Sequence, residues 1–161
     1  RLPAKRKIKV RVPAGVDEGM SLRVAGAGEV SERGGLPGDM YVVIRVKKDP
    51  VFTRHDDDLH AELHLTFVQA VFGGEFEIPT LSGKVKLRVP QGTQSHTNFR
   101  IRGEGFPRIG RKGRGDLFVK TIVAVPQKLN ERQKEALREF SKASGEDEAG
   151  ASDGFFKKVF G

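Results

Sequence analysis

The sequence repeats itself at a fixed offset of 77 residues. The stretch that begins at Lys7 returns at Lys84 without a gap, and 13 of 40 aligned positions are identical. Average residue usage would give roughly two or three identities over that length. The shared positions are Lys7/Lys84, Lys9/Lys86, Arg11/Arg88, Val12/Val89, Pro13/Pro90, Gly15/Gly92, Arg23/Arg100, Gly26/Gly103, Gly28/Gly105, Gly38-Asp39/Gly115-Asp116, Val42/Val119 and Val46/Val123. The same turns therefore punctuate both copies, which predicts two small modules of one design.

Apolar and polar residues alternate with a period of two through most of both copies, and this pattern predicts strands with one buried face. The apolar positions are Ile8, Val10 and Val12; Leu22 and Val24; Met40, Val42, Ile44 and Val46; Leu59, Ala61, Leu63 and Leu65; Val85, Leu87 and Val89; Phe99 and Ile101; Leu117, Val119, Val123 and Val125. The Gly/Pro-rich connections between them are too short for crossover helices. We therefore expect a mainly β fold of two tandem, sandwich-like domains with mostly antiparallel strands.

Two segments depart from this alternation and predict helices. Thr66 and Gln69 have the spacing of a capping box, and Gly73 is a C-terminal stop signal, so a short helix is expected between Thr66 and Gly73. Asn130 with Gln133 is a second N-cap signal and predicts a helix that runs to about Ala143. Three apolar residues can lie on one side of that second segment: Leu129, Leu137 and Phe140. An acidic linker follows over residues 144–153, and then an apolar tail with Phe155, Phe156 and Phe160 that is expected to dock.

Composition excludes several function classes. The chain has no cysteine, which rules out disulfides and thiol chemistry within it, and the default compartment is the cytoplasm. No apolar run is long enough to span a bilayer, so no membrane partner is expected. We find no serine in a nucleophile elbow and no phosphate-binding loop, and expect no enzyme and no cofactor in this chain.

The formal net charge of +8 leaves a nucleic-acid partner open as an alternative. The cations concerned alternate with apolar residues, as on the exposed face of a strand, and no aromatic residues interleave with them for base stacking. They are Lys7, Lys9, Arg11, Lys84, Lys86 and Arg88. A solvated strand face is the better interpretation, and we expect no nucleic-acid partner.

Histidines and carboxylates gather between His55 and His64, a density that raises a metal site or a metal-dependent hydrolase as a further alternative. Here His60, Glu62 and His64 alternate with leucine and alanine, which is typical of an exposed strand face, and residues 56–58 have the composition of a turn. We therefore predict no metal site.

Several blocks of residues occur in a specific order along the chain. In the first copy and just after it they are Val12-Pro13-Ala14-Gly15-Val16-Asp17-Glu18-Gly19-Met20, Leu36-Pro37-Gly38-Asp39-Met40-Tyr41-Val42, Phe52-Thr53-Arg54-His55-Asp56-Asp57-Asp58-Leu59 and Gln69-Ala70-Val71-Phe72-Gly73. In the second they are Val89-Pro90-Gln91-Gly92-Thr93-Gln94, Gly103-Glu104-Gly105-Phe106-Pro107, Gly113-Arg114-Gly115-Asp116-Leu117 and Pro126-Gln127-Lys128-Leu129. These blocks resemble the C-terminal substrate-binding region of the DnaJ family of J-domain co-chaperones, and the ending Gly154-Phe155-Phe156-Lys157-Lys158 resembles a bacterial DnaJ tail.

The resemblance implies a domain plan. Residues 1–51 correspond to the second half of C-terminal domain I, after the insertion point of a zinc module; residues 52–126 to a complete domain II; and residues 127–161 to a dimerisation helix, linker and tail. The J-domain and the zinc-binding cysteine-rich module of the family have no counterpart in this sequence, so zinc is expected only in a longer protein that contains that module.

The resemblance also implies function. It predicts a co-chaperone fragment, active in protein folding and the heat-shock response, that binds unfolded polypeptide clients for a DnaK-type chaperone and forms a homodimer. The client-binding positions that it implies are Ile8 and Val42 in the first copy and Leu59, Ile78, Val85 and Val119 in the second. The dimerisation residues are Leu129, Leu137, Phe140, Phe155, Phe156 and Phe160. From the residues alone, a core position is the better interpretation of any single one of these apolar residues.

Overall fold

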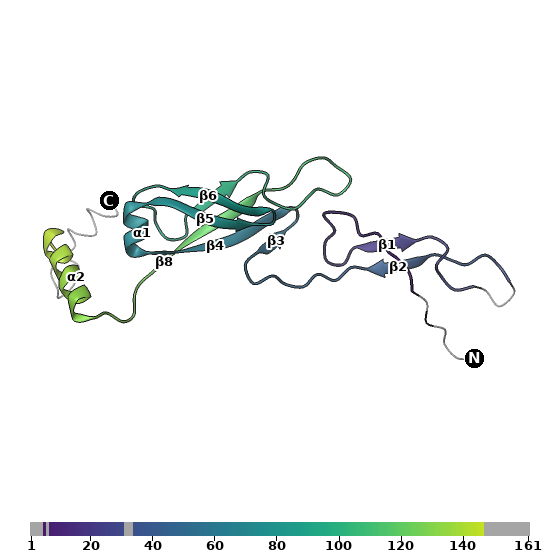
Figure 1. Ribbon diagram of the computed structural model, residues 1–161, viewed down its shortest axis with the longest axis horizontal. Helices are drawn as coiled ribbons and strands as arrows, with labels where there is room; N and C mark the ends of the chain where they lie inside the picture. The colour runs from purple at the N-terminus through teal and green to yellow at the C-terminus, as the bar shows by residue number, and fades with distance from the viewer. Residues whose placement is uncertain (1–4, 6, 31–33, 147–161) are drawn as a thin grey trace. The chain divides into compact units, whose positions relative to one another are not determined.

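The computed structural model describes residues 5, 7–30 and 34–146, and the chain forms two compact units, Arg1–Ala124 and Val125–Gly161 (Figure 1). The elements, in chain order, are β1 (Ser21–Val24), β2 (Met40–Val43), β3 (Thr53–His55), β4 (Asp58–Thr66), α1 (Phe67–Phe72), β5 (Gly74–Thr80), β6 (Gly83–Val89), β7 (Asn98–Ile101), β8 (Leu117–Ala124) and α2 (Glu131–Ala143). The predictions of a mainly β fold, one short helix and a C-terminal helix are confirmed. We call residues 7–51 the first module and residues 52–124 the second; this division remains a prediction.

The second module contains a four-stranded sheet in the order β3-β4-β8-β7. The pairs β1–β2, β3–β4, β5–β6 and β7–β8 are antiparallel, as expected. The central pair β4–β8 is parallel, with Leu59 opposite Leu117 and Leu65 opposite Val123. No single crossover helix is needed, because the connection from β4 to β8 runs through α1, the β5–β6 hairpin and β7. The β5–β6 hairpin covers one face of the buried parallel pair β4–β8.

The core lies between the four-stranded sheet and the β5–β6 hairpin (Figure 1). Leu117 and Val119 of β8 are fully buried, and Leu59 of β4 and Ile78 of β5 are exposed by only 1% and 3%. A second cluster joins Leu65, Ala70 and Val89 at the end of the sheet covered by α1. Side chains from both layers complete the two clusters: Phe52, Leu63, Phe76, Leu87, Phe99, Ile101, Phe106 and Val123.

The helix α1 begins and ends as its sequence predicts. The Thr66 hydroxyl accepts a hydrogen bond from the Gln69 amide at 3.1 Å, and the Gln69 side chain accepts one from the Thr66 amide at 2.9 Å. Gly73 ends the helix with φ of 68°, and a Cβ there would lie 2.5 Å from the Val89 carbonyl oxygen. Only glycine fits this position, because both the backbone conformation and the space exclude a side chain.

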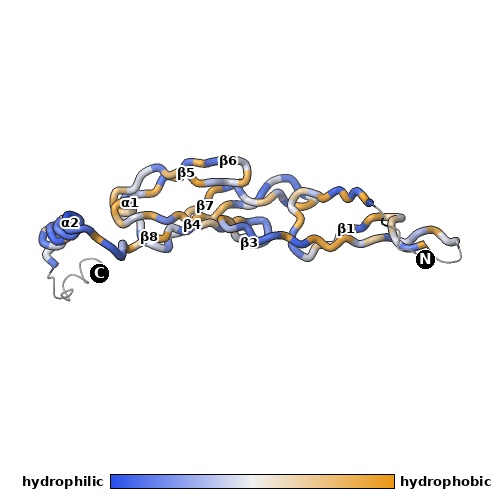
Figure 2. Tube along the Cα trace, turned by 60° about the horizontal axis from the view of Figure 1, so that its bottom comes forward, coloured by the Kyte–Doolittle hydropathy of each residue, from blue (hydrophilic) through white to orange (hydrophobic). Residues whose placement is uncertain are grey.

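The helix α2 has the same type of N-cap. The Asn130 side chain accepts a hydrogen bond from the Gln133 amide at 2.8 Å, and the Gln133 side chain accepts one from the Asn130 amide at 2.9 Å. None of the residues of α2 is buried in the single chain. Figure 2 shows this helix as mostly hydrophilic, in contrast to the mixed colouring of the β-strands.

The 77-residue repeat corresponds to one hairpin that is built twice. Ser21 pairs with Val43 in β1–β2, and Asn98 pairs with Lys120 at the same offset in β7–β8. In each copy an aspartate joins the arginine of the first strand to a glycine amide of the following turn. The bonds are Arg23 Nε to Asp39 at 2.7 Å and Gly26 N to Asp39 at 3.2 Å; and Arg100 Nε to Asp116 at 2.7 Å and Gly103 N to Asp116 at 2.9 Å.

The aspartate of the second copy is held in its charged form. The hydrogen bond from the Gly103 amide, followed by that from the Arg100 side chain, lowers the pKa of Asp116 from its ordinary value of 3.8. The shared bonds explain why Arg, Gly and Gly-Asp positions are among those identical between the copies.

One predicted strand does not form. Residues 7–13 of the first module, which carry Ile8, Val10 and Val12, have no strand structure, although their counterpart β6 is a strand throughout Gly83–Val89. The difference follows from pairing, because β6 is hydrogen-bonded to β5 along its whole length. Among the described residues, no segment stands in the place of β5 beside residues 7–13. An isolated alternating segment has no partner for its backbone groups and stays irregular.

Candidate functional site

The strand β2 has an open edge. In the described part of the chain β2 pairs only with β1, whereas its counterpart β8 lies between β7 and β4. The Ile44 amide donates to the Met20 carbonyl at 2.8 Å on the β1 side. Because amides alternate along a strand, those of Tyr41 and Val43 point to the other edge. This edge offers backbone donors and acceptors to an extended chain.

Apolar side chains flank this edge on both faces of the strand. Tyr41 and Val43 are exposed by 64% and 59% on one face. Val42 on the other face is half-buried, as is Leu22 opposite it on β1. The sequence held a signal for this arrangement, since residues 40–44 are apolar without interruption, and such a run indicates a strand with apolar residues on both faces.

A shallow pocket of about 450 Å³ adjoins β1 in the first module. Residues 9–13 form one wall and β1 the other, and the lining residues are Lys9, Val10, Arg11, Pro13, Leu22, Arg23, Val24 and Ala25. Ile8, which precedes this wall, is half-buried. The first module therefore presents an open strand edge and an apolar depression on the same small hairpin. Of the residues expected to bind clients, Ile8 and Val42 lie in this module and are partly accessible.

Most of the client-binding positions expected in the second module lie in its core. Leu59, Ile78 and Val119 are core residues with at most 3% exposure, and Val85 opposite Ile78 is half-buried. The three core side chains offer no surface to a peptide in this conformation, because they pack together between the four-stranded sheet and the β5–β6 hairpin. The burial of these three residues agrees with the core interpretation, and their role as client contacts remains a prediction.

An arginine that sequence reasoning did not single out ties the two modules together. The Arg54 guanidinium donates to the carbonyl oxygens of Val16 at 2.6 Å and Gly15 at 2.8 Å, and lies 3.5 Å from the Asp17 carboxylate. It also stacks on the Phe106 ring, with 4.0 Å from the guanidinium carbon to the ring centre. These partners lie far from Arg54 in the sequence, so no local pattern marks them.

The histidine-rich segment forms the outer face of the four-stranded sheet. His60, Glu62 and His64 are exposed there, as predicted, in a groove of about 830 Å³. The His60 ring lies edge-on to His55, with 4.7 Å between ring centres, and stacks on Phe118 at 5.2 Å. Within the described ranges, no group of three or more histidine, aspartate or glutamate side chains is arranged to hold a metal ion.

The expected dimerisation residues fall in two groups. Leu137 and Phe140 are exposed by 41% and 51% on α2, and Leu129 just before the helix is half-buried. Phe155, Phe156 and Phe160 lie outside the described residues. No helix in the described part of the chain has the length and apolar character needed to cross a membrane.

The chain is similar over nearly its whole length to known proteins. A family model for the DnaJ C terminal domain matches residues 2–126, and a model for the Chaperone protein DnaJ C-terminal region matches residues 132–159. Chaperone protein DnaJ of Brevibacillus choshinensis is 49% identical over 99% of this chain, and that of Ruminiclostridium cellulolyticum is 47% identical over 99%. Chaperone protein DnaJ of Clostridioides difficile is 49% identical over 97%.

The match covers 43%, 42% and 39% of the three relatives, so the chain spans about two fifths of their length. The matched region contains both copies of the hairpin, the open β2 edge and the covered second module. The chain therefore belongs to the DnaJ C-terminal domain family.

Proposed function

We propose that this chain binds unfolded polypeptide as part of a co-chaperone and presents it to a DnaK-type chaperone. The observation that carries the proposal is the open edge of β2, with exposed Tyr41 and Val43 on one face and half-buried Val42 on the other. Membership of a family whose relatives are called chaperone protein DnaJ supports the same function. The proposal assigns no catalysis to the chain and expects it to act in the cytoplasm.

An extended client segment can add to β2 as a third strand. Its backbone would pair with the amides of Tyr41 and Val43, and its apolar side chains would contact Val42 and the pocket beside β1. Backbone pairing is independent of side-chain identity, so affinity comes with little sequence selection. In a longer protein that supplies a counterpart of β4, this edge would be paired, and clients would instead contact apolar side chains such as Ile8 and Val42.

The experiment mixes the chain with a chemically unfolded reporter enzyme and follows aggregation by light scattering. The double variant I8S/V42S removes apolar contacts from the first module, and we expect it to lose most of the suppression of aggregation. A matched control, L36S/V125S, makes the same chemical change at side chains that are 95% and 83% exposed. Equal suppression by both variants and the parent chain would reject Ile8 and Val42 as client contacts.

The proposal includes a homodimer formed through the C-terminal unit. Leu137 and Phe140 are exposed although they are apolar, and a helix of 13 residues with no buried side chain is marginal by itself in water. Packing against a second copy would bury this apolar stripe and stabilise α2.

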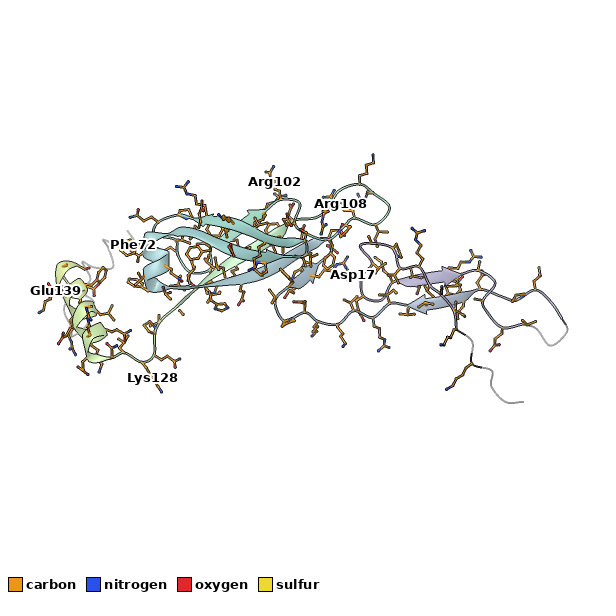
Figure 3. The ribbon with its side chains drawn as sticks, viewed as in Figure 1. Asp17, Phe72, Arg102, Arg108, Lys128 and Glu139 are labelled. Carbon is orange, nitrogen blue, oxygen red and sulfur yellow. The ribbon has the colours of Figure 1, made fainter. Side chains whose placement is uncertain are left out.

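Light scattering of the purified chain measures this directly. Deletion of residues 127–161 should give a monomer, and L137S/F140S should shift the equilibrium toward monomer at micromolar concentration. F72S is the control, because Phe72 is a 73% exposed phenylalanine on α1 (Figure 3). An unchanged mass after the deletion would contradict dimerisation through this unit.

A further inference from the structure

The second module carries a strongly basic loop over residues 107–114. It contains Arg108, Arg111, Lys112 and Arg114 and no acidic residue. The loop continues the β7–β8 hairpin: Pro107 pairs with Arg114 as a β-bridge, and the Arg108 amide donates to the Gly113 carbonyl at 3.1 Å. The backbone at the base of the basic loop is therefore held in place, with Arg108 next to the Pro107–Arg114 bridge (Figure 3).

These cations are available for a partner. All four are exposed. Within the described residues, no carboxylate lies within ion-pair distance of any of them. The Arg114 Nε donates to the Gly105 carbonyl oxygen at 3.0 Å, which leaves its charge uncompensated. Ile109, 39% exposed, adds an aliphatic contact between the cations.

The repeat shows that the fold does not require this charge. The counterpart of the basic loop is residues 30–37, which contain one glutamate and one arginine and are neutral overall. Both hairpins have the same hydrogen bonds at the base of the loop, from Gly28 to Gly38 at 2.7 Å and from Gly105 to Gly115 at 2.8 Å. Four like charges on a short loop repel one another and bring no gain to a hairpin that forms equally without them.

We propose that the basic loop is a docking site for acidic polypeptide segments. Arginine pairs with carboxylates through two parallel hydrogen bonds, and the loop supplies three arginines and one lysine on a rigid base. A segment that alternates acidic and aliphatic residues would pair with the cations and contact Ile109. This site is separate from the apolar surface of the first module and does not depend on the function proposed for it.

A nucleic acid fits this surface less well. Binding of single strands relies on open aromatic faces on which bases stack. The nearest aromatic residue in the sequence is Phe106, and the Arg54 guanidinium lies over its ring at 4.0 Å. The apolar side chain exposed within the loop is the aliphatic Ile109.

Fluorescence anisotropy of a labelled peptide with four Glu-Ser-Leu repeats tests the proposal on the full chain at about 50 mM salt, where screening is weak. The variant R108Q/R111Q/K112Q should bind this peptide about tenfold more weakly, since each lost pair removes a modest surface contribution. The control K84Q/K86Q/R88Q removes the same charge from the exposed face of β6 and should change affinity less than twofold. Thermal unfolding should be unchanged in the loop variant, because within the described residues none of the three replaced side chains, Arg108, Arg111 and Lys112, forms an ion pair.

Three comparisons separate binding by the basic loop from binding by the apolar surface, by net charge or by a nucleic-acid site. A Gln-Ser-Leu peptide should show no difference between parent and loop variant; its binding reports on the apolar surface, so failure of that surface is distinguishable from failure of the basic loop. Equal loss in both charge variants would overturn the proposal, since it would mean attraction by net charge alone. A labelled oligonucleotide that binds more tightly than the acidic peptide, and loses affinity selectively in the loop variant, would assign the loop to nucleic acid instead.

Discussion

The hairpins β1–β2 and β7–β8 have the same register and the same Arg-Asp-Gly bonds, yet they differ in burial. Val119 of β8 is fully buried, whereas Val42, its equivalent in β2, is half-buried. The cause is the neighbouring strands, since β4 and the β5–β6 hairpin cover β8 and nothing in the described chain covers β2 in this way. A local sequence motif can therefore specify a hairpin completely without specifying whether its faces are core or binding surface.

The largest difference between the copies is expected from a core truncation. Leu117→Ala should cost about 2–5 kcal/mol, because it leaves a cavity at a fully buried position. Met40→Ala at the equivalent position should cost less than about 1 kcal/mol, because Met40 is only half-buried. Urea unfolding followed by amide NMR signals of each module measures both costs. Equal costs would mean that β2 is as well covered as β8.

A glycine pair sharpens the comparison with a smaller effect. A Cβ at Gly115 would lie 2.0 Å from the carbonyl oxygen of Asp57, the residue before β4, so Gly115→Ala should destabilise the second module by about 1–3 kcal/mol. At the equivalent Gly38, the nearest atom to a Cβ is the Glu29 carbonyl oxygen at 4.0 Å. Gly38→Ala should change stability by less than about 0.5 kcal/mol. A tolerated Gly115→Ala in thermal unfolding would show that β4 does not pack against this turn.

The smallest effect is expected from the aspartate of the second copy, and it depends on pH. The pKa of Asp116 is lowered in the folded state, so its stabilisation is present above its ordinary pKa of 3.8 and is lost as pH falls through the lower folded value. Asp116→Asn should be less stable than the parent at pH 7, and the difference should shrink between about pH 5 and pH 2. A difference that does not change over that range would assign the effect to geometry rather than to charge.

The local features of the fold could be predicted from the sequence because their causes are local. Thr66 with Gln69 and Asn130 with Gln133 cap their helices through bonds three residues apart, and alternation marked β4, β6, β7 and β8. The strand expected at residues 7–13 does not form, because its cause is not local. Its formation depends on a paired neighbour, and alternation carries no information on whether that neighbour exists.

The candidate site was predictable only in part for the same reason. Ile78 of β5 and Val119 of β8 have the apolar character of a binding pocket, but they are core because the β5–β6 hairpin packs on the sheet with both side chains between the two layers. Arg54 contacts residues 15–17 through tertiary structure alone, and no spacing in the sequence indicates it. The uninterrupted apolar run over residues 40–44 was the one local signal at this site, and it indicates apolar residues on both faces of the strand without indicating whether they are covered.

Amide hydrogen exchange of the two equivalent strands tests the central claim most directly. In the free chain we expect the amides of Tyr41 and Val43 to exchange much faster than those of Phe118 and Lys120, which face β4. Addition of an unfolded apolar peptide should slow exchange at Tyr41 and Val43 and leave Phe118 and Lys120 unchanged. If the two β2 amides are as protected as their β8 counterparts in the free chain, or if saturating peptide does not slow their exchange, the account of β2 as an open, client-binding edge is wrong.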